Sequence, residues 1–123
     1  MAFKQTRVVT ADVAKLTRFY ESVSQARASA LSSGYVEFQS APCEGLAIVD
    51  LAEIRSYGKG VVEPGANRSV ILDFEVANVD AEYERLLDSV SDWVMLPTVQ
   101  PWGARAIQFR DPDGNLVNMF SYP

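Results

Sequence analysis

The sequence predicts an α+β fold built from two βαβββ repeats, whose curved mixed sheets would surround a cavity. The chain has 123 residues, which is the usual size of one domain. Hydrophobic periodicity gives the order strand, helix and three strands twice, with a glycine-rich connection between the two sets. We therefore expect a single domain of two modules, at about residues 3–51 and 68–122, joined by a flexible linker at 53–67.

Apolar residues of the two helical segments support the internal repetition. They match at an offset of 67 residues, pairing Leu16, Phe19 and Tyr20 with Tyr83, Leu86 and Leu87. Each helix would cover one face of its own sheet. The opposite face of each sheet would then be free to line a cavity.

The first module begins with a predicted strand at residues 3–10. Asp12 follows at the N-cap position of a helix, where its carboxylate can accept from free backbone amides. Apolar residues at helical spacing extend this amphipathic helix to about residues 22–24. Residues 25–32 are ambiguous and include a weak edge-strand candidate. Clearer strands are expected at 34–39 and 46–51.

The connection between the modules has a different composition. Gly58, Gly60, Pro64 and Gly65 interrupt any regular pattern, so residues 53–68 are predicted to be a long loop or lid. Its first glycines resemble a phosphate-binding loop only superficially. Glu63 stands at the last glycine position of that motif, and no strand and helix flank it.

The second module repeats the pattern of the first. An alternating strand is predicted at residues 70–76, and Asn78 or Asp80 caps the helix that follows. The apolar face of that helix consists of Val79, Tyr83, Leu86, Leu87 and Val90. Three further strands are predicted at 93–99, 104–109 and 116–121.

Residues 111–115 join the last two strands and have the sequence Asp-Pro-Asp-Gly-Asn. Proline at the second position suits a type I turn, and Gly114 can take the positive φ that closes it. A calcium-binding EF-hand loop needs its glycine at position six, whereas this glycine is at position four. The segment is therefore predicted to be a hairpin turn.

Two residue counts exclude whole classes of chemistry. The chain has no histidine, which excludes Ser-His-Asp and Cys-His nucleophiles and histidine-based metal sites. It has one cysteine, Cys43, so neither an intrachain disulfide nor a thiolate metal cluster can form. A lone buried thiol is the expectation for Cys43, because no nearby group in the sequence would lower its pKa.

The net charge of −5 disfavours nucleic-acid binding, which usually requires a basic face. No uninterrupted apolar run exceeds four residues, far below the roughly 20 that a membrane span requires. The first residues also lack the hydrophobic core of a signal peptide. We therefore expect a cytoplasmic protein with no nucleic-acid or membrane partner.

Two stretches, residues 12–20 and 109–117, resemble motifs of the vicinal oxygen chelate superfamily. This superfamily contains glyoxalase I, extradiol dioxygenases and bleomycin-resistance proteins. In its usual pattern an aspartate opens the first helix, Phe-Tyr follows seven residues later, and Asp-Pro-Asp-Gly-Asn precedes the last strand. Asp12, Phe19 and Tyr20 match the first motif, and residues 111–115 match the second. The resemblance covers nearly the whole chain and implies the fold of that superfamily.

The metal enzymes of this superfamily place one ligand on each of the first, fourth, fifth and eighth strands. The resemblance implies that Gln5, Asp50, Ile71 and Asn118 occupy these positions. A divalent cation prefers charged or strongly donating ligands, and isoleucine provides no donor atom. The resemblance therefore points to the metal-free branch, with no cofactor and no metal. Its bleomycin-resistance proteins confer antibiotic resistance by sequestering a ligand without turnover.

The predicted function is accordingly metal-independent binding of an aromatic or cationic small molecule in a cavity. Strand alternation places further side chains on the same sheet faces as the four implied positions. Trp102 stands at a strand end, where relatives often have pocket walls. The predicted ligand-binding residues are Gln5, Arg7, Asp50, Ile71, Asp73, Trp102, Asn118 and Phe120. A solvent-exposed sheet face would give the same alternation.

Two other functions stay open. One is a glyoxalase-like lyase or isomerase acting on a small carbonyl compound, with Asp50, Asp73, Arg7 or Arg105 transferring protons without metal. The other is a partner-binding module with a vestigial cavity. Two Trp, five Tyr and six Phe exceed the needs of one small core, which predicts a homodimer. The modules could pair within a chain or between chains, with pockets at or near the interface and walled by Trp102 and the last strand.

Overall fold

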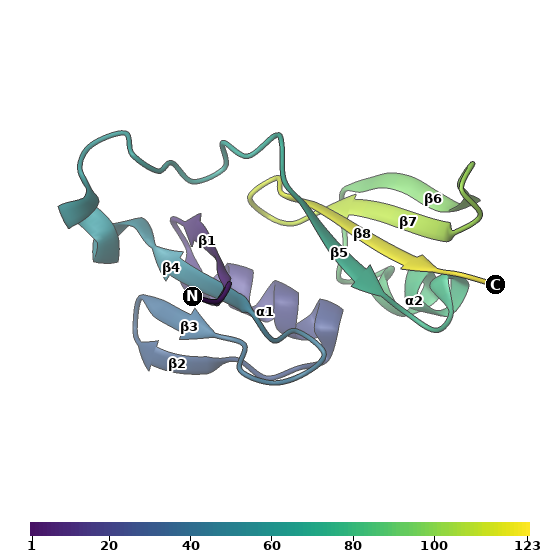
Figure 1. Cartoon of the computed structure of the whole chain (residues 1–123), viewed down its shortest axis with the longest axis horizontal. Helices are drawn as coiled ribbons and strands as arrows, with labels where there is room; N and C mark the ends of the chain where they lie inside the picture. Colours follow the sequence, from purple (N-terminus) through teal and green to yellow (C-terminus); the bar gives the residue numbers. More distant parts are fainter. The chain divides into compact units, whose positions relative to one another are not determined.

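Figure 1 shows the computed structural model of the protein, which describes all residues from 1 to 123. The chain forms two compact units, Met1–Ala66 and Asn67–Pro123. Each unit contains one open four-stranded sheet, with an α-helix packed against it. Both units have the element order βαβββ, so the predicted α+β fold of two repeats is confirmed. Neither the two α-helices nor the 3-10 helix has the length and apolar content needed to span a bilayer.

Unit 1 contains five regular elements and a 3-10 helix. These are β1 (Thr6–Thr10), α1 (Val13–Ser24), β2 (Ser29–Ser32), β3 (Tyr35–Glu37), β4 (Leu46–Asp50) and η1 (Leu51–Tyr57). The strand order is β1-β4-β3-β2, with β1 parallel to β4 and the other pairs antiparallel. The ambiguous segment at 25–32 is therefore an edge strand at its C-terminal end.

Helix α1 begins and ends where local chemistry requires it. The Asp12 carboxylate accepts a hydrogen bond from the backbone N–H of Lys15 at 3.0 Å, as the sequence predicts. Gln25 ends the helix in the left-handed conformation, with a φ of 59°. Leu16 and Tyr20, both fully buried, form the apolar face of α1, which packs against β3 and β4.

The predicted loop at 53–68 starts with a helix, which the sequence analysis missed. The Asp50 carboxylate accepts from the backbone N–H of Ala52 at 2.8 Å and caps η1. Ile54 is buried and anchors that helix to unit 1. Regular structure ends only at Gly58, whose φ of 102° no helix allows. Residues 58–70 contain no helix or strand.

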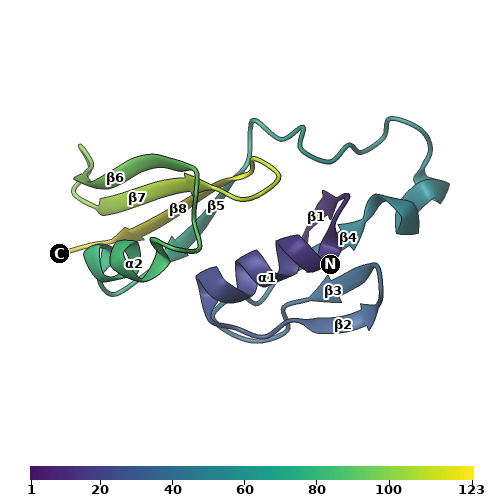
Figure 2. The same cartoon turned by 180° about the vertical axis from the view of Figure 1, so that it is seen from behind.

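Unit 2 contains five regular elements. These are β5 (Ile71–Glu75), α2 (Val79–Leu86), β6 (Trp93–Val99), β7 (Arg105–Arg110) and β8 (Leu116–Ser121). The strand order is β5-β8-β7-β6, which repeats the order of unit 1. Only β5 and β8 run parallel. Figure 2 shows α2 on one face of this sheet, and the helix contacts β6, β7 and β8.

Helix α2 differs from its predicted extent at the C-terminal end. Asn78, rather than Asp80, is the N-cap and accepts from the backbone N–H of Ala81 at 3.0 Å. The helix ends at Leu86, and Leu87 is exposed rather than part of the apolar face. Since the N-caps Asp12 and Asn78 correspond, the helices repeat at an offset of 66 residues, not 67.

The segment Asp-Pro-Asp-Gly-Asn forms the predicted hairpin turn between β7 and β8. Asp111 is buried, and its Oδ1 accepts from the backbone N–H groups of Asp113 and Asn115, both at 2.9 Å. Its Oδ2 accepts from the Asn115 side chain at 2.8 Å. Gly114 has a φ of 88° and donates its N–H to the Asp111 carbonyl. One buried carboxylate therefore organises the whole turn.

Candidate functional site

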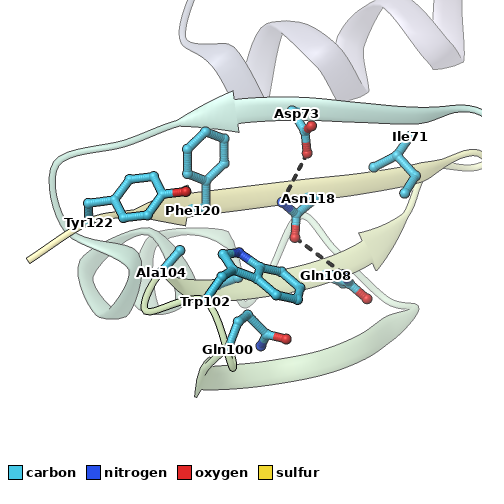
Figure 3. Close-up of a pocket in the computed structure, with 10 residues that line it drawn as sticks. Ile71, Asp73, Gln100, Trp102, Ala104, Gln108, Asn118, Phe120 and Tyr122 are labelled. Carbon is cyan, nitrogen blue, oxygen red and sulfur yellow. Dashed lines mark hydrogen bonds between the residues drawn. The ribbon is translucent and has the colours of Figure 1, made fainter.

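The sheet face of unit 2 that lies away from α2 contains a cavity of about 310 Å³ (Figure 3). The ladder register explains which side chains reach it. Asp73 pairs with Asn118, and Asn118 pairs with Gln108, so these three polar side chains share one face across β5, β8 and β7. The alternate residues Val117 and Met119 are buried on the opposite face, where α2 packs. The cavity is lined by Ile71, Asp73, Gln100, Trp102, Ala104, Ala106, Gln108, Asn118, Phe120 and Tyr122.

The three polar side chains form a continuous hydrogen-bonded row, drawn as dashed lines in Figure 3. Asn118 Nδ2 donates to Asp73 Oδ1 at 2.9 Å. Gln108 Nε2 donates in turn to Asn118 Oδ1 at 3.3 Å. Asp73 is the one residue with a full charge among the lining residues at neutral pH, so the cavity has one negative charge.

Aromatic side chains surround this polar row. The rings of Phe120 and Tyr122 meet edge to face, with their centroids 5.9 Å apart. Trp102 lies in the turn between β6 and β7, and 68% of its surface is exposed. That turn is closed by the Gly103 N–H, which donates to the Gln100 carbonyl at 2.9 Å, and Gly103 takes a φ of 99°. The indole therefore lies at a strand end, as predicted.

Five of the eight predicted ligand-binding residues lie together in this cavity. They are Ile71, Asp73, Trp102, Asn118 and Phe120. The sequence analysis missed Gln108, although its signal was present. Counting outward from the predicted turn at 111–115 pairs residue 108 with residue 118. Gln100 had no such signal, because two register shifts between β6 and β7 disturb the alternation.

Gln5 and Arg7 belong to unit 1 and lie on the sheet face away from α1. Gln5 Nε2 donates to the Tyr35 hydroxyl at 3.0 Å, and that hydroxyl donates to the Glu37 carboxylate. The bond to Glu37 raises the pKa of Tyr35 and lowers the pKa of Glu37. Arg7 Nη1 donates to the Tyr57 hydroxyl at 2.8 Å, with the guanidinium 5.5 Å from the ring centroid.

Asp50, the remaining predicted residue, is not brought together with Gln5 and Arg7. In the β1–β4 ladder, Arg7 pairs with Ala47 and Thr10 pairs with Asp50. Positions three residues apart on a strand point to opposite faces, so Asp50 faces away from Arg7. Its carboxylate caps η1 instead. The predicted grouping of Asp50 with Gln5 is therefore corrected.

The ladders also correct the correspondence between the two repeats. Arg7 and Asp73 correspond at the offset of 66 that the helix caps define. Their strand partners are Ala47 and Asn118. Ala47, rather than Asp50, is thus the counterpart of Asn118 in unit 1.

The four positions that the resemblance assigns to metal ligands do not fit a divalent cation. Ile71 has no donor atom, and the Asn118 amide is hydrogen-bonded at both ends to Asp73 and Gln108. Gln5 contacts Tyr35, whose ladder partner Val49 points to the face opposite that of its neighbour Asp50. No group of three Cys, Asp or Glu side chains converges in either unit.

Comparison with known proteins agrees with this architecture. The glyoxalase-like domain family matches residues 3–121. An uncharacterized protein of Bacillus subtilis, YraH, is 30% identical over 125 residues, covering 98% of each chain. A glyoxalase/bleomycin resistance protein/dioxygenase from Nocardioides is 26% identical, with a TM-score of 0.80 over 99% of this chain and 83% of that one.

A family enzyme of the same description from Burkholderia phytofirmans has a TM-score of 0.85 over all of both chains, at 12% identity. At that identity the likeness shows the fold alone. Fold, turn motif and family match together define a member of the vicinal oxygen chelate superfamily. Within it, the chain belongs to the glyoxalase-like domain family.

Proposed function

We propose that the protein is a metal-independent binding protein that sequesters an aromatic or cationic small molecule in the cavity of unit 2. The observation that carries this proposal is the position of one carboxylate, Asp73, on a cavity face bordered by Trp102, Phe120 and Tyr122. Small-molecule sites usually combine an apolar, aromatic wall with a few fixed polar groups. This cavity has that composition.

The two kinds of side chain act on different parts of a ligand. Aromatic rings offer flat apolar surface for stacking, and their electron-rich faces also attract cations. The Asp73 carboxylate adds a charge that Asn118 holds in one orientation. A ligand that combines a ring with a positive charge would use both features at once.

A thermal-shift screen of the full chain tests the proposal. The compounds are cationic antibiotics, with bleomycin among them, and small carbonyl compounds, with methylglyoxal among them. Each is measured with EDTA and again with added Zn²⁺. We expect an aromatic or cationic compound to raise the melting temperature equally in both conditions, without being consumed. Metal-dependent conversion of a carbonyl compound would contradict the proposal and support the lyase alternative.

Two variants place the binding in the cavity. Trp102→Ala removes a cavity wall and is expected to abolish the thermal shift. Leu87→Ala removes a comparable exposed apolar side chain at the end of α2 and is expected to leave the shift unchanged. Equal shifts in both variants would exclude the cavity as the binding site.

We propose in addition that two chains form a two-fold symmetric homodimer. Each sheet ends in two unpaired edge strands, β1 and β2 in unit 1 and β5 and β6 in unit 2. Exposed apolar side chains accompany the β6 edge, namely Val94, Leu96 and Val99. Unpaired edges and clustered exposed apolar residues favour association with another chain.

A further inference from the structure

The orientations of the Asn118 and Gln108 amides follow from the charge of Asp73. A carboxylate only accepts hydrogen bonds, so the Asn118 group that contacts it must be the NH₂ group. Asn118 Oδ1 therefore faces Gln108, and Gln108 must present its own NH₂ group to that oxygen. Reversing either amide would place two donors or two acceptors in contact.

Gln100 is oriented by a second, separate set of acceptors. Its Nε2 donates to the Thr98 carbonyl at 3.2 Å and to Met95 Sδ at 3.3 Å. A carbonyl oxygen and a thioether sulfur both accept only. The NH₂ group of Gln100 is therefore directed at β6, and its Oε1 is left without a donor.

The hydrogen bonds leave three side-chain acceptors for a ligand along the floor of the cavity. They are the second carboxylate oxygen of Asp73 and the Oε1 atoms of Gln100 and Gln108. Figure 3 shows the two glutamines beside Trp102, and Asp73 beyond Asn118. The side-chain donors that remain are the second amide hydrogens of Asn118 and Gln108. The Trp102 indole and the Tyr122 hydroxyl are further donors. A ligand that satisfies these three acceptors must supply N–H or O–H groups.

We propose that the ligand is a planar cation with two or more N–H donors, of the aromatic amidine or guanidine class. This inference rests on the proposed function and names its ligand chemistry. The amidinium group would donate to the Asp73 carboxylate and to a glutamine oxygen, while the attached ring stacks on Trp102. A cation without N–H groups would cover the same acceptors and leave them unsatisfied, which is unfavourable.

Four aromatic compounds of similar size separate the contributions that charge, hydrogen-bond donors and ring stacking make to binding. They are benzamidine, phenyltrimethylammonium, benzamide and benzoate, each titrated calorimetrically into the full chain near pH 7. We expect benzamidine to bind about tenfold more tightly than phenyltrimethylammonium or benzamide, since one charge-assisted hydrogen bond contributes roughly that factor. Benzoate is expected to bind most weakly, because its charge repels Asp73.

A matched pair of variants tests the role of Asp73. Asp73→Asn removes the charge and no longer dictates the direction of Asn118, so the preference for benzamidine over benzamide should disappear. Asp88→Asn makes the same charge change at an exposed site after α2 and should leave that preference intact. Because both aspartates are exposed, unchanged melting temperatures serve as the check that both variants fold.

The contrary outcomes distinguish the inference from the function on which it rests. Equal binding of benzamidine and phenyltrimethylammonium would show that charge alone decides, and would overturn the donor requirement. Benzamide is neutral but also has N–H donors, so equal binding of benzamidine and benzamide would show that the positive charge contributes nothing. That result would overturn the assignment of a cation. Either result leaves the small-molecule site standing. Binding of none of the four compounds would overturn the proposed site together with the inference.

Discussion

The Arg105 guanidinium binds both carboxylate oxygens of Asp80, with distances of 2.8 Å from Nε and 2.9 Å from Nη2. This pair joins β7 to the first turn of α2, on the sheet face opposite the cavity. Arg105 was a candidate for proton transfer in the enzymatic alternative. Its pairing with Asp80 gives it a structural role instead, since it holds the helix start against the strand.

Asp80→Asn is predicted to lower the melting temperature slightly at neutral pH. The bond to Arg105 lowers the pKa of Asp80 in the folded state. A group whose pKa is lower in the folded than in the unfolded state stabilises the fold at pH values above its unfolded-state pKa. This stabilisation is lost as the pH falls through the folded-state pKa. Melting curves of the two proteins should therefore converge as the pH falls below the usual aspartate range. Both partners are exposed, so the effect is small. A difference that persists in acid would contradict this account.

Asp111→Ala is predicted to destabilise the protein by about 3 kcal/mol, because three N–H donors lose a buried carboxylate acceptor. Urea unfolding followed by circular dichroism measures the change. Pro112→Ala, an exposed substitution in the same turn, is the control and should cost much less. If both variants lose the same stability, the turn backbone rather than the carboxylate holds the hairpin together.

Cys43 is predicted to resist thiol reagents in the folded protein. Its side chain is buried, and this burial raises the pKa of the thiol to about 11. The thiolate is the reactive form, so labelling with Ellman's reagent at pH 8 should be slow in buffer and fast in 6 M guanidinium chloride. The sequence-based expectation of a lone buried thiol agrees with this position. Fast labelling of the native protein would show that the thiol is accessible.

Local periodicity was sufficient to predict the architecture of this protein. The N-cap at Asp12, the apolar spacing of α1 and the turn at 111–115 are all formed by residues adjacent in sequence. Such features depend on short-range geometry, which a sequence shows directly. On β5 and β8, the resemblance supplied Ile71 and Asn118, and strand alternation then placed Asp73 and Phe120 on the same face.

The errors arose where register depends on distant parts of the chain. The two helices repeat at an offset of 66 residues, but the corresponding ladder partners Ala47 and Asn118 are 71 residues apart in the sequence. The two units differ in the lengths of their elements: β6 and β7 have seven and six residues against four and three in β2 and β3, whereas α2 has eight residues against twelve in α1. The resemblance assigned Asp50 to the fourth-strand position, whereas the ladder shows that Asp50 faces away from Arg7. The capping role of Asp50 could not be predicted, because the glycines that follow η1 indicated a loop where this helix forms.

The proposed homodimer predicts a mass in solution of twice the 13.6 kDa of one chain. Light scattering behind size-exclusion chromatography, at micromolar concentration, measures this mass. If the interface includes Trp102 and the last strand, Trp102→Glu should shift the mass toward one chain, because a buried charge without a partner is costly. Leu87→Glu places the same charge at an exposed apolar position at the end of α2 and should leave the mass unchanged.

A single-chain mass for the unmodified protein would exclude the dimer, and the cavity would then act within one chain. A dimer that withstands Trp102→Glu would place the interface away from the cavity, on other exposed apolar residues such as Leu96 of β6.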